Sequence, residues 1–562
     1  MKPTLALFVG LLSLGSAFAA TSSNTITVTI LGFNDFHGNL MPTGFRVPDP
    51  KDRTKTLSVQ AGGIETLASM IEDIRSQNPN TVVVGGGDLI GASPLVSNLL
   101  ADEPTIMALN EIGLVTSVVG NHEFDQGTAE LMRMQNGGCD SVVRKDKACK
   151  LGNFKGAQFP YIAANVMDSK TQKPLFAPYK ITTVNGIKIA FVGAILKETP
   201  TIVVPSGVAG LEFTDEAEAI NRTIPELKAN GVETIVALIH QGGSSTDPFD
   251  VIDCKTLSGP IVDIVKRLDK SVDAVMTGHT HRGYQCRIDG MLVTQGDAFG
   301  HLLTRLDLSI DTNTHDVLLA TSQNLVVDPS KTAPNAKMTA LVQQAKSLTD
   351  AISAVPVAKM AVEQITTDST PAGESALGDV IADSQLFATQ SPENGGAQIA
   401  FMNPGGIRAP LPPNVPNPNK VVTFGDSFTV QPFGNSLVVM TLTGAQIKLL
   451  LEQQWLNQDR PRMLQVSQGF SYTWDDKNPV GEKVLTETIK LNGQTIDPKG
   501  NYRITVNSFL ADGGDKFFVL QQGTDRLGGD VDLDALQNYM RAMESANTPI
   551  KPGERNRITR LN

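Results

Sequence analysis

Several features that would indicate a common protein class are scarce in this 562-residue sequence. It has four cysteines and no C-x-x-C pair, which disfavours a metal site built from cysteine ligands. The net charge is −11, which argues against a nucleic acid polymer as an electrostatically captured partner. No hydrophobic segment or lipid-anchor tail is visible at the C-terminal end, so we expect no stable membrane anchor. Oligomeric state is unknown at this stage.

The first twenty residues predict export. Lys2 gives a positive start, an apolar stretch follows, and Ala17-Phe18-Ala19 fits the small-x-small pattern of signal peptidase sites. The apolar stretch is shorter than the roughly 20 residues of a membrane-spanning helix, which favours cleavage. We therefore expect a signal peptide at 1–20 and a periplasmic or secreted protein.

The cysteines agree with an oxidising compartment, where disulfides form. Three pairings are possible in principle. We favour Cys139 with Cys149, which closes a short Lys-rich loop, and Cys254 with Cys286, because both follow strands expected to carry functional residues.

Five short apolar, strand-like runs each end in a potential metal ligand or catalytic group. The runs are Ile26 to Phe33, Thr81 to Val84, Ser117 to Val119, Ile235 to Ile239 and Ala274 to Met276. Helical apolar spacing lies between them, so the pattern predicts an α/β domain whose functional groups gather at the carboxyl ends of the strands.

Domain boundaries follow from length and composition. A chain of this length is too long for one hydrophobic core. We expect a first domain over 25–330, a linker helix in 331–356 and a second domain over 357–562. The alternative for the linker is a surface helix of the first domain.

The histidines favour a metal site. The chain has seven, and five of them directly follow apolar strands among Gly, Asp and Asn. A lone histidine is more often structural, and we expect that role for His301 and His315. Candidate ligands are Asp35, His37, Asp88, Asn121, His240, His279 and His281. Seven imidazole, carboxylate and amide ligands exceed the needs of one ion, whereas two ions that share a bridging aspartate would use them all.

Motifs in these same places resemble those of the dinuclear metallophosphoesterases. They are Asp35-Phe-His37, Gly86-Gly-Asp88, Gly120-Asn-His-Glu-Phe-Asp125, Ile239-His240 and Gly278-His-Thr-His281. With an additional C-terminal domain, the chain resembles the secreted 5′-nucleotidase family, which includes UDP-sugar hydrolases. The resemblance implies an N-terminal β-sandwich flanked by helices, a linking helix and a smaller α/β substrate domain.

The resemblance also implies residue roles and cofactors. Two divalent ions of the zinc, manganese or cobalt type are expected. Asp35, His37 and His281 would hold one, Asn121, His240 and His279 the other, and Asp88 would bridge them. His122 would stabilise the transition state or assist the leaving group, and Asp125 would orient it. Some family members carry Gln at the position of His281, which makes that ligand the least fixed.

Three later motifs resemble the family's substrate motifs. They are Asn403-Pro-Gly-Gly-Ile-Arg408, Gln431-Pro-Phe433-Gly-Asn435 and Ser508-Phe509-Leu-Ala-Asp-Gly-Gly-Asp515. The resemblance implies that Phe433 and Phe509 sandwich a base, that Asp515 accepts the ribose hydroxyls, and that Arg408 and Asn403 meet the phosphate. The alternative is that these phenylalanines are core residues and the Gly-Gly pairs are turns.

One departure concerns the substrate. The family often has an arginine before Gly373-Glu-Ser-Ala-Leu-Gly-Asp379, and no basic residue stands there in this chain. The expected activity is hydrolysis of nucleoside 5′-monophosphates, with di- and triphosphates or nucleotide sugars as further substrates. The alternatives are a 2′,3′-cyclic phosphodiesterase with 3′-nucleotidase activity, whose relatives tend to have Asn at Asp125, a thiosulfate-ester hydrolase, and a catalytically silent nucleotide-binding protein.

Overall fold

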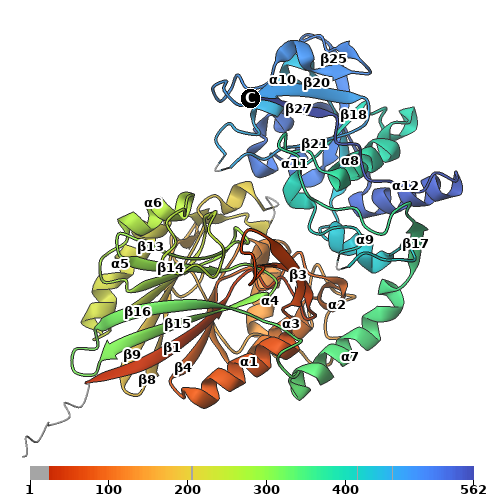
Figure 1. The fold of residues 1–562 in the computed structure, drawn as a ribbon. Coiled ribbons are helices and arrows are strands. Elements are labelled where there is room, and N and C mark those ends of the chain that lie inside the picture. Colours follow the sequence, from red (N-terminus) through yellow and green to blue (C-terminus); the bar gives the residue numbers. More distant parts are fainter. Residues whose placement is uncertain (1–23, 204–206, 414, 459) are drawn as a thin grey trace, which may run out of the picture.

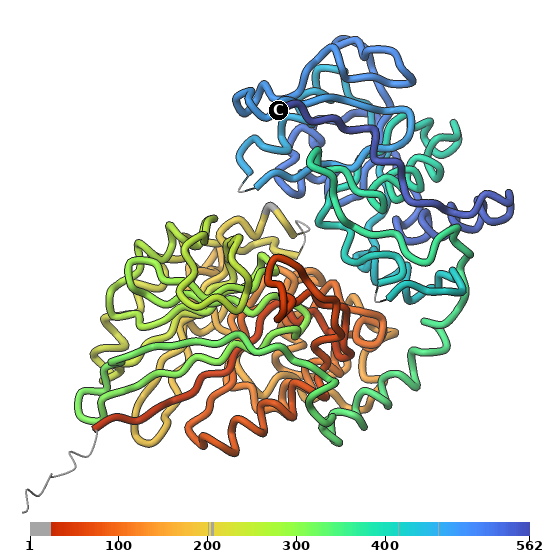
Figure 2. The backbone as a smooth tube through the Cα atoms, in the orientation of Figure 1, coloured from red at the N-terminus to blue at the C-terminus, as the bar shows by residue number. Residues whose placement is uncertain are grey.

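The computed structural model describes residues 24–203, 207–413, 415–458 and 460–562. The expected signal peptide, residues 1–20, lies outside the described residues. The chain forms two bodies joined by a long helix, which Figure 1 shows as ribbons and Figure 2 as a backbone tube. The expected fold class is confirmed: a β-sandwich with flanking helices is followed by a smaller α/β domain.

Two six-stranded mixed sheets form the N-terminal domain. The first runs in the order β16 (Val317–Val326), β15 (Leu302–Asp311), β1 (Thr25–Phe33), β4 (Thr81–Gly85), β5 (Leu114–Val118) and β6 (Tyr161–Ile162). The second runs in the order β13 (Gly283–Ile288), β14 (Met291–Gly296), β12 (Ala274–Thr277), β11 (Thr234–His240), β9 (Ile187–Ile195) and β8 (Tyr179–Val184). Strands β1, β4, β5 and β6 are parallel, as are β9, β11, β12 and β14.

The strands are apolar on both faces because both faces are buried. In β1, Ile30 packs into the core between the two sheets while Leu31 packs into the core under the first helical layer. In β11, Leu238 faces the other sheet while Ala237 packs into the core with the second helical layer. Period-two alternation therefore places apolar side chains in two cores at once.

Helices cover the outer face of each sheet. Against the first sheet lie α1 (Ile64–Gln77), α3 (Glu103–Glu111) and α4 (Thr128–Asn136), and against the second lie α5 (Glu216–Ala229) and α6 (Pro260–Arg267). The remaining N-terminal elements are α2 (Leu95–Asn98), the hairpin β2 (Thr43–Pro48) and β3 (Thr56–Ala61), and the pair β7 (Val166–Asp168) and β10 (Leu211–Phe213).

Helix α7 (Ala336–Ser353) connects the two bodies (Figure 1). Its buried residues Met338, Val342 and Ala345 belong to the core of the first domain. Val355, just after the helix, accepts a hydrogen bond from Phe424 N of the second domain. The helix therefore packs on the first domain, and the chain enters the second domain just after the C-terminal end of the helix.

The C-terminal domain is built on a five-stranded sheet with helices around it. The sheet runs β21 (Gln465–Val466), β18 (Ile399–Met402), β25 (Asn501–Asn507), β20 (Ser436–Thr443) and β26 (Thr524–Val531). A four-stranded sheet runs β24 (Gln494–Thr495), β23 (Lys490–Leu491), β22 (Phe470–Asp475) and β27 (Ile558–Leu561), and β17 (Pro356–Lys359) pairs with β19 (Val421–Thr423). The helices are α8 (Ala376–Thr389), α9 (Phe424–Val430), α10 (Gly444–Glu452), α11 (Ser508–Ala511) and α12 (Asp532–Ser545).

Both expected disulfides are present. Cys139 is bonded to Cys149, and Cys254 to Cys286. The first closes the loop that follows α4, and the second ties the loop after β11 to β13.

Candidate active site

The seven expected ligands converge at one edge of the β-sandwich. Asp35 and His37 follow β1, Asp88 follows β4, Asn121 follows β5, His240 ends β11, and His279 and His281 follow β12. All but His279 and His281 are buried, and these two are partly exposed. The carboxyl ends of parallel strands from both sheets thus supply one polar cluster.

One group of potential ligands is formed by Asp35, His37 and His281, whose ligand atoms all lie within 4.8 Å of one another. The Nε2 atoms of His37 and His281 are 3.2 Å apart, and His281 Nε2 lies 3.4 Å from Asp35 Oδ1. Three side chains from two sheets therefore point at one position.

The second group contains Asp88, His240 and His279. His240 Nε2 lies 3.0 Å from Asp88 Oδ2, and His279 Nδ1 lies 3.0 Å from Asn121 Oδ1. The same Oδ2 atom of Asp88 is 3.8 Å from His37 Nε2 in the first group. Asp88 consequently lies between the two groups, where a bridging carboxylate would be needed.

The arrangement of protons and lone pairs fits cations at this place. The Nδ1 atoms of His37 and His240 are 2.8 Å from the carbonyl oxygens of Gly91 and Gly86. A carbonyl only accepts, so each Nδ1 carries the hydrogen, and in the neutral ring the Nε2 lone pair points inward. Burial lowers the pKa of His240, but the charge of Asp88 outweighs it and raises the pKa to about 10, so a cation bound there would replace the Nε2 proton. Burial lowers the pKa of His37 well below its usual value, which favours the neutral ring. Convergent imidazole nitrogens and carboxylates suit divalent metals.

Five of the seven residues adopt a left-handed backbone. Their φ angles are 50° for Asp35, 45° for His37, 51° for Asp88, 72° for His279 and 51° for His281. Such angles are costly for residues with a side chain and concentrate at functional sites. Close approach also requires glycine beside them: a Cβ on Gly87 would lie 2.5 Å from His240 Nδ1.

His122 and Asp125 form a hydrogen-bonded pair beside the cluster. His122 Nδ1 is 2.8 Å from Asp125 Oδ2, and the His122 backbone N–H donates to Asp88 Oδ1 at 2.8 Å. Burial lowers the pKa of His122, but the charges of Asp125 and Asp88 outweigh it and raise the pKa above its usual value. His122 also lies close enough to His37 and Asp88 to be a ligand itself.

Glu123 is a positioning residue that the sequence reasoning missed. Its carboxylate accepts hydrogen bonds from the backbone N–H groups of Asp88, Leu89 and Gly120, at 2.9, 2.8 and 2.6 Å. Burial and the nearby Asp88 charge raise the pKa of Glu123 to about 7. It fastens the loop after β4 to the loop after β5, and its place inside the motif Gly120-Asn-His-Glu123 was the available clue.

Phe299 is a second missed residue. It has a left-handed backbone, with φ of 57°, and its N–H donates to the carbonyl of Asp35 at 2.7 Å. Its ring meets the edge of His281 at a centroid distance of 5.4 Å and lies 5.9 Å from His37. The ring thus supports two of the expected ligands from behind.

The two histidines outside this cluster lie elsewhere. His301 is buried and bonded through both ring nitrogens, to Asp297 and Thr43, while His315 lies in the turn between β15 and β16. Neither lines the cavity described next.

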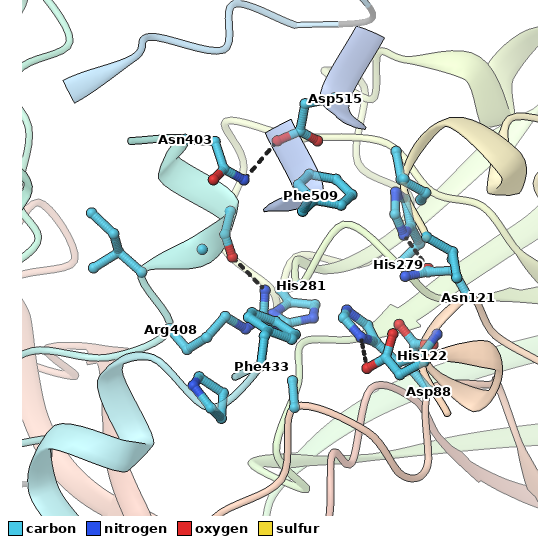
Figure 3. A pocket seen from close by; sticks show the side chains of 18 of the residues that line it. Asp88, Asn121, His122, His279, His281, Asn403, Arg408, Phe433, Phe509 and Asp515 are labelled. Atoms are coloured by element: carbon cyan, nitrogen blue, oxygen red, sulfur yellow. Dashed lines mark hydrogen bonds and ion pairs between the residues drawn. The ribbon is translucent and has the colours of Figure 1, made fainter. Parts of the chain in front are cut away.

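A cavity of about 560 Å³ opens over the cluster and is lined by both domains. The N-terminal domain contributes Asp88, Asn121, His122, His279 and His281, and the C-terminal domain contributes all five expected substrate residues: Asn403, Arg408, Phe433, Phe509 and Asp515. Figure 3 shows these side chains around one space. Motifs more than 100 residues apart are therefore brought together.

Phe433 and Arg408 lie directly over the catalytic cluster. The Phe433 ring stacks on the ring of His122, with centroids 5.7 Å apart and planes at 18°, and the guanidinium of Arg408 lies 5.7 Å from the Phe433 centroid. Nη2 of Arg408 is buried without a hydrogen-bond partner among the described residues. Phe509 lies apart from them, nearer Asp515 (Figure 3).

Four arginines of the cavity were not anticipated: Arg144, Arg282, Arg460 and Arg462. Arg460 and Arg462 follow α10, and both line the cavity. In the segment before Gly373, where the family often has an arginine, Thr367 lines the cavity. The charges of Arg462 and Arg460 act on His279, while that of Arg408 acts on His37 and His122. Positively charged side chains therefore lie on two sides of the cluster. The strand-end motifs of the sequence did not predict these charges.

Two family models match this chain. One, described as calcineurin-like phosphoesterase, matches residues 28–283, and the other, described as 5′-nucleotidase, C-terminal domain, matches residues 355–522. The chain belongs to the 5′-nucleotidase family of calcineurin-like phosphoesterases. Membership places it among metal-dependent hydrolases of nucleotide phosphoesters, in agreement with the cluster and the cavity.

Individual relatives of this 5′-nucleotidase family differ in length. Endonuclease YhcR of Bacillus subtilis (strain 168) is 30% identical over 530 residues, which is 94% of this chain and 41% of that protein. This chain therefore spans less than half the length of YhcR. Snake venom 5′-nucleotidase of Naja atra is 25% identical over 561 residues, covering 92% of this chain and 96% of that protein.

Among solved structures, the 5′-nucleotidase precursor from Thermus thermophilus has a TM-score of 0.76 at 26% identity, covering 96% of this chain and 100% of that chain. The two-domain family architecture thus extends over nearly the whole of this chain. No helix among the described residues is long and apolar enough to cross a membrane.

Proposed function

We propose that this protein hydrolyses nucleoside 5′-monophosphates to nucleoside and phosphate outside the cytoplasm. The observation that carries the proposal is the shared cavity, which has the histidine and carboxylate cluster on one wall and two phenylalanines, an arginine and Asp515 on the other. A phosphate at the cluster and a base at the phenylalanines would belong to one molecule that spans the cavity.

Two divalent ions of the zinc, manganese or cobalt type are proposed as cofactors. Asp35, His37 and His281 would hold one, Asn121, His240 and His279 would hold the other, and Asp88 would contribute to both sites. When bound, such ions activate water for in-line attack on phosphorus and neutralise charge on the phosphoryl oxygens.

His122 and Asp125 are proposed as the catalytic pair of the protein itself. Because Asp125 accepts from Nδ1, the ring is held with Nε2 free to face substrate and to donate a hydrogen bond or a proton. The raised pKa of His122 favours the protonated imidazole. Its role is to stabilise the transition state or to assist departure of the nucleoside oxygen.

Substrate binding is assigned to the C-terminal wall. Arg408 has a buried, unpartnered Nη2 next to the cluster and is placed to meet a phosphoryl oxygen, together with Asn403. Phe433 and Phe509 stack on the base, and Asp515 accepts the ribose hydroxyls. Since the Phe433 ring now stacks on His122, a movement of the second domain would free this ring to stack on the base.

Rotation of the C-terminal domain about the end of α7 would provide that movement. The first half of α7 is packed on the N-terminal domain, whereas Phe424 N is bonded to Val355 O just past its end. We place the hinge between Thr349 and Pro356.

Phosphate release tests the function directly. The purified protein is assayed with AMP, ADP, UDP-glucose, 3′-AMP and 2′,3′-cyclic AMP, with and without added Mn²⁺ and after chelation. Fastest release from AMP, lost on chelation and restored by Mn²⁺, is expected. Faster release from 3′-AMP or the cyclic nucleotide would replace the proposal with the cyclic phosphodiesterase alternative, and no release from any of them would leave a silent nucleotide-binding protein.

A further inference from the structure

Asp515 is held in an unusual backbone conformation by a neighbouring loop. Its φ and ψ angles are 53° and 26°, in the left-handed region, and it is only 4% exposed. Gln458, in the loop after α10, donates from Nε2 to the Asp515 carbonyl at 2.7 Å. The backbone of Asp515 is therefore fixed from outside its own turn.

The Asp515 carboxylate is fixed as well. Nη1 of Arg462 lies 3.0 Å from Oδ1. Nδ2 of Asn403 donates to Oδ2 at 2.9 Å, a hydrogen bond that is drawn in Figure 3. Both oxygens of the carboxylate are thus engaged by the protein, and the plane of the group is set by two side chains from different loops.

This network continues to the aromatic wall. Asn507 donates from Nδ2 to Oδ1 of Asn403 at 2.9 Å, and its own Oδ1 accepts from Leu510 N as the N-cap of α11. Helix α11 carries Phe509. Arg462, Asp515 and Asn403 therefore belong to one hydrogen-bonded chain that ends at Leu510 N, in the helix that carries the proposed base-stacking residue.

The position of Arg462 allows two roles. Its charge reaches His279, so it could bind a phosphoryl oxygen at the cluster and replace the arginine missing before Gly373. Its hydrogen bond to Asp515 indicates the other role, which is to orient the carboxylate that receives the sugar. A carboxylate has about four lone pairs, and the contacts with Arg462 and Asn403 use two of them. The remaining two match two vicinal hydroxyl donors in number.

We propose that Arg462 is a positioning residue for sugar recognition: it orients the Asp515 carboxylate to receive both the 2′- and 3′-hydroxyls of a ribonucleotide. The inference rests on the proposed function and deepens it, because it makes the protein selective for ribonucleotides over deoxyribonucleotides. Arg462 then acts through Asp515, and the phosphate is left to Arg408, Asn403 and the metal ligands.

The test compares substrates with and without the hydroxyls in the full-length protein and in Arg462→Met. AMP, 2′-deoxy-AMP, 3′-deoxy-AMP and p-nitrophenyl phosphate are assayed for kcat and KM. A hydrogen bond to a charged group discriminates by roughly tenfold or more, so the unaltered protein should prefer AMP over each deoxy analogue by about that factor. In Arg462→Met the preference should fall to about threefold or less, mainly through the KM for AMP, while turnover of p-nitrophenyl phosphate should fall by a smaller factor than kcat/KM for AMP.

Two further variants separate positioning from a general structural role. Arg462→Lys keeps a donor and should recover part of the preference. In the Asp515→Asn background, Arg462→Met should leave the AMP to deoxy-AMP ratio unchanged, because the group through which it acts is already altered. Arg541→Met, on the exposed face of α12, removes the same charge from the same domain and should have no effect.

The outcomes are distinguishable. An equal loss of AMP and p-nitrophenyl phosphate turnover in Arg462→Met would assign Arg462 to the phosphoryl group and overturn the inference. The inference would also be overturned if the unaltered protein showed no preference for AMP over the deoxy analogues, or if Arg462→Met kept the full preference. If Arg462→Met does not fold, Arg462→Lys and the double-variant comparison still decide. Absence of AMP hydrolysis in the unaltered protein would instead defeat the proposed function.

Discussion

The two walls of the cavity are built by different means. On the N-terminal wall, the main chain fixes the functional side chains. His37 and His240 each bond a backbone carbonyl, and the Asp35 and Asp88 carboxylates each receive a backbone N–H, from His279 and His122. The ends of buried strands hold these backbone groups in place.

On the C-terminal wall, side chains hold side chains. Asp515 is bonded to Arg462 and Asn403, and Phe433 rests on His122 of the opposite domain. Arg408 presents a buried nitrogen with no partner among the described residues. This wall is therefore completed by neighbouring loops and by what occupies the cavity, whereas the N-terminal wall is preformed.

This difference between the two walls indicates that the N-terminal wall serves the reaction and the C-terminal wall serves substrate recognition. Changes on the preformed wall should affect turnover of every phosphate ester, because they alter the reacting centre. Changes on the other wall should affect mainly nucleotides. Comparing AMP with p-nitrophenyl phosphate, which has neither base nor ribose, therefore assigns each variant to one wall.

The largest effect is expected for Asp88→Ala. Asp88 lies between the two ligand groups, so its loss should remove both ions and lower turnover of both substrates by several orders of magnitude. Metal analysis of the purified variant checks the assignment independently of activity. A variant that still holds about two ions per chain would show that Asp88 is not the bridge.

His122→Ala should have the next largest effect. We expect kcat for both substrates to fall by roughly 10²- to 10⁴-fold, as for general acid–base groups, with metal content near that of the unaltered protein. The control is decisive here because His122 is close enough to His37 and Asp88 to ligate. Loss of one ion together with activity would make His122 a ligand.

Phe433→Ala and Phe509→Ala should affect nucleotides selectively. Stacking of a base on an aromatic ring contributes about 1–3 kcal/mol, so kcat/KM for AMP should fall roughly five- to 150-fold. Only Phe433 touches His122. If its ring also positions that histidine, Phe433→Ala alone will slow p-nitrophenyl phosphate, and the two walls would prove to be coupled at this contact.

Phe299→Ala should produce a smaller change on the preformed wall. The Phe299 ring supports His281, which is the most exposed of the histidine ligands proposed for the first ion. Removing it should weaken occupancy of the first site while the second ion, held by His240 and His279, is kept. Metal titration of Phe299→Ala checks this, with Phe387→Ala, on α8 and away from the cavity, as the matched control.

Sequence reasoning succeeded where position along the chain determines position in space. Each proposed ligand follows an apolar strand, and the carboxyl ends of parallel strands meet, so Asp35, Asp88 and His240 were expected to cluster. The α/β class followed in the same way, from alternating apolar strands and helices, whereas the β-sandwich was expected only from the family resemblance. The pairing of Cys254 with Cys286 was also expected from strand order.

What was missed depends on tertiary contacts between loops. Arg462 and Gln458 lie in a loop with no strand-end pattern, and their partner Asp515 is more than 50 residues away. Phe299 is one of many phenylalanines, and only its left-handed backbone marks it. Glu123 stood inside a motif, but its three backbone partners are set by the fold.

The smallest effect on turnover is expected in the core of the C-terminal domain. The motif Gly373-Glu-Ser-Ala-Leu-Gly-Asp379 lies there and holds the last strand. Glu374 accepts from Arg557 N and Ile558 N, and Asp379 Oδ2 accepts from Arg555 N at 3.0 Å. Burial raises the pKa of Asp379 to about 7; the charge of Arg557 opposes this rise and that of Glu374 adds to it. This cluster does not line the cavity, so we expect it to affect the free energy of unfolding and not the rate of catalysis.

The sign of the pH dependence follows from that pKa. An unfolded aspartate titrates near 3.9, so between about pH 4 and 7 the folded state binds one proton more than the unfolded state. The free energy of unfolding should therefore fall as pH rises through this window, by up to about 1.4 kcal/mol per pH unit from this group. Asp379→Asn mimics the protonated carboxyl and should remove that slope while AMP turnover at pH 7 stays unchanged. Urea unfolding of both proteins at pH 5, 6 and 7 measures the difference. Parallel pH profiles of stability for the unaltered protein and Asp379→Asn would show that Asp379 is ionised throughout this window. A loss of AMP turnover in a folded Asp379→Asn would show that this core also contributes to nucleotide recognition.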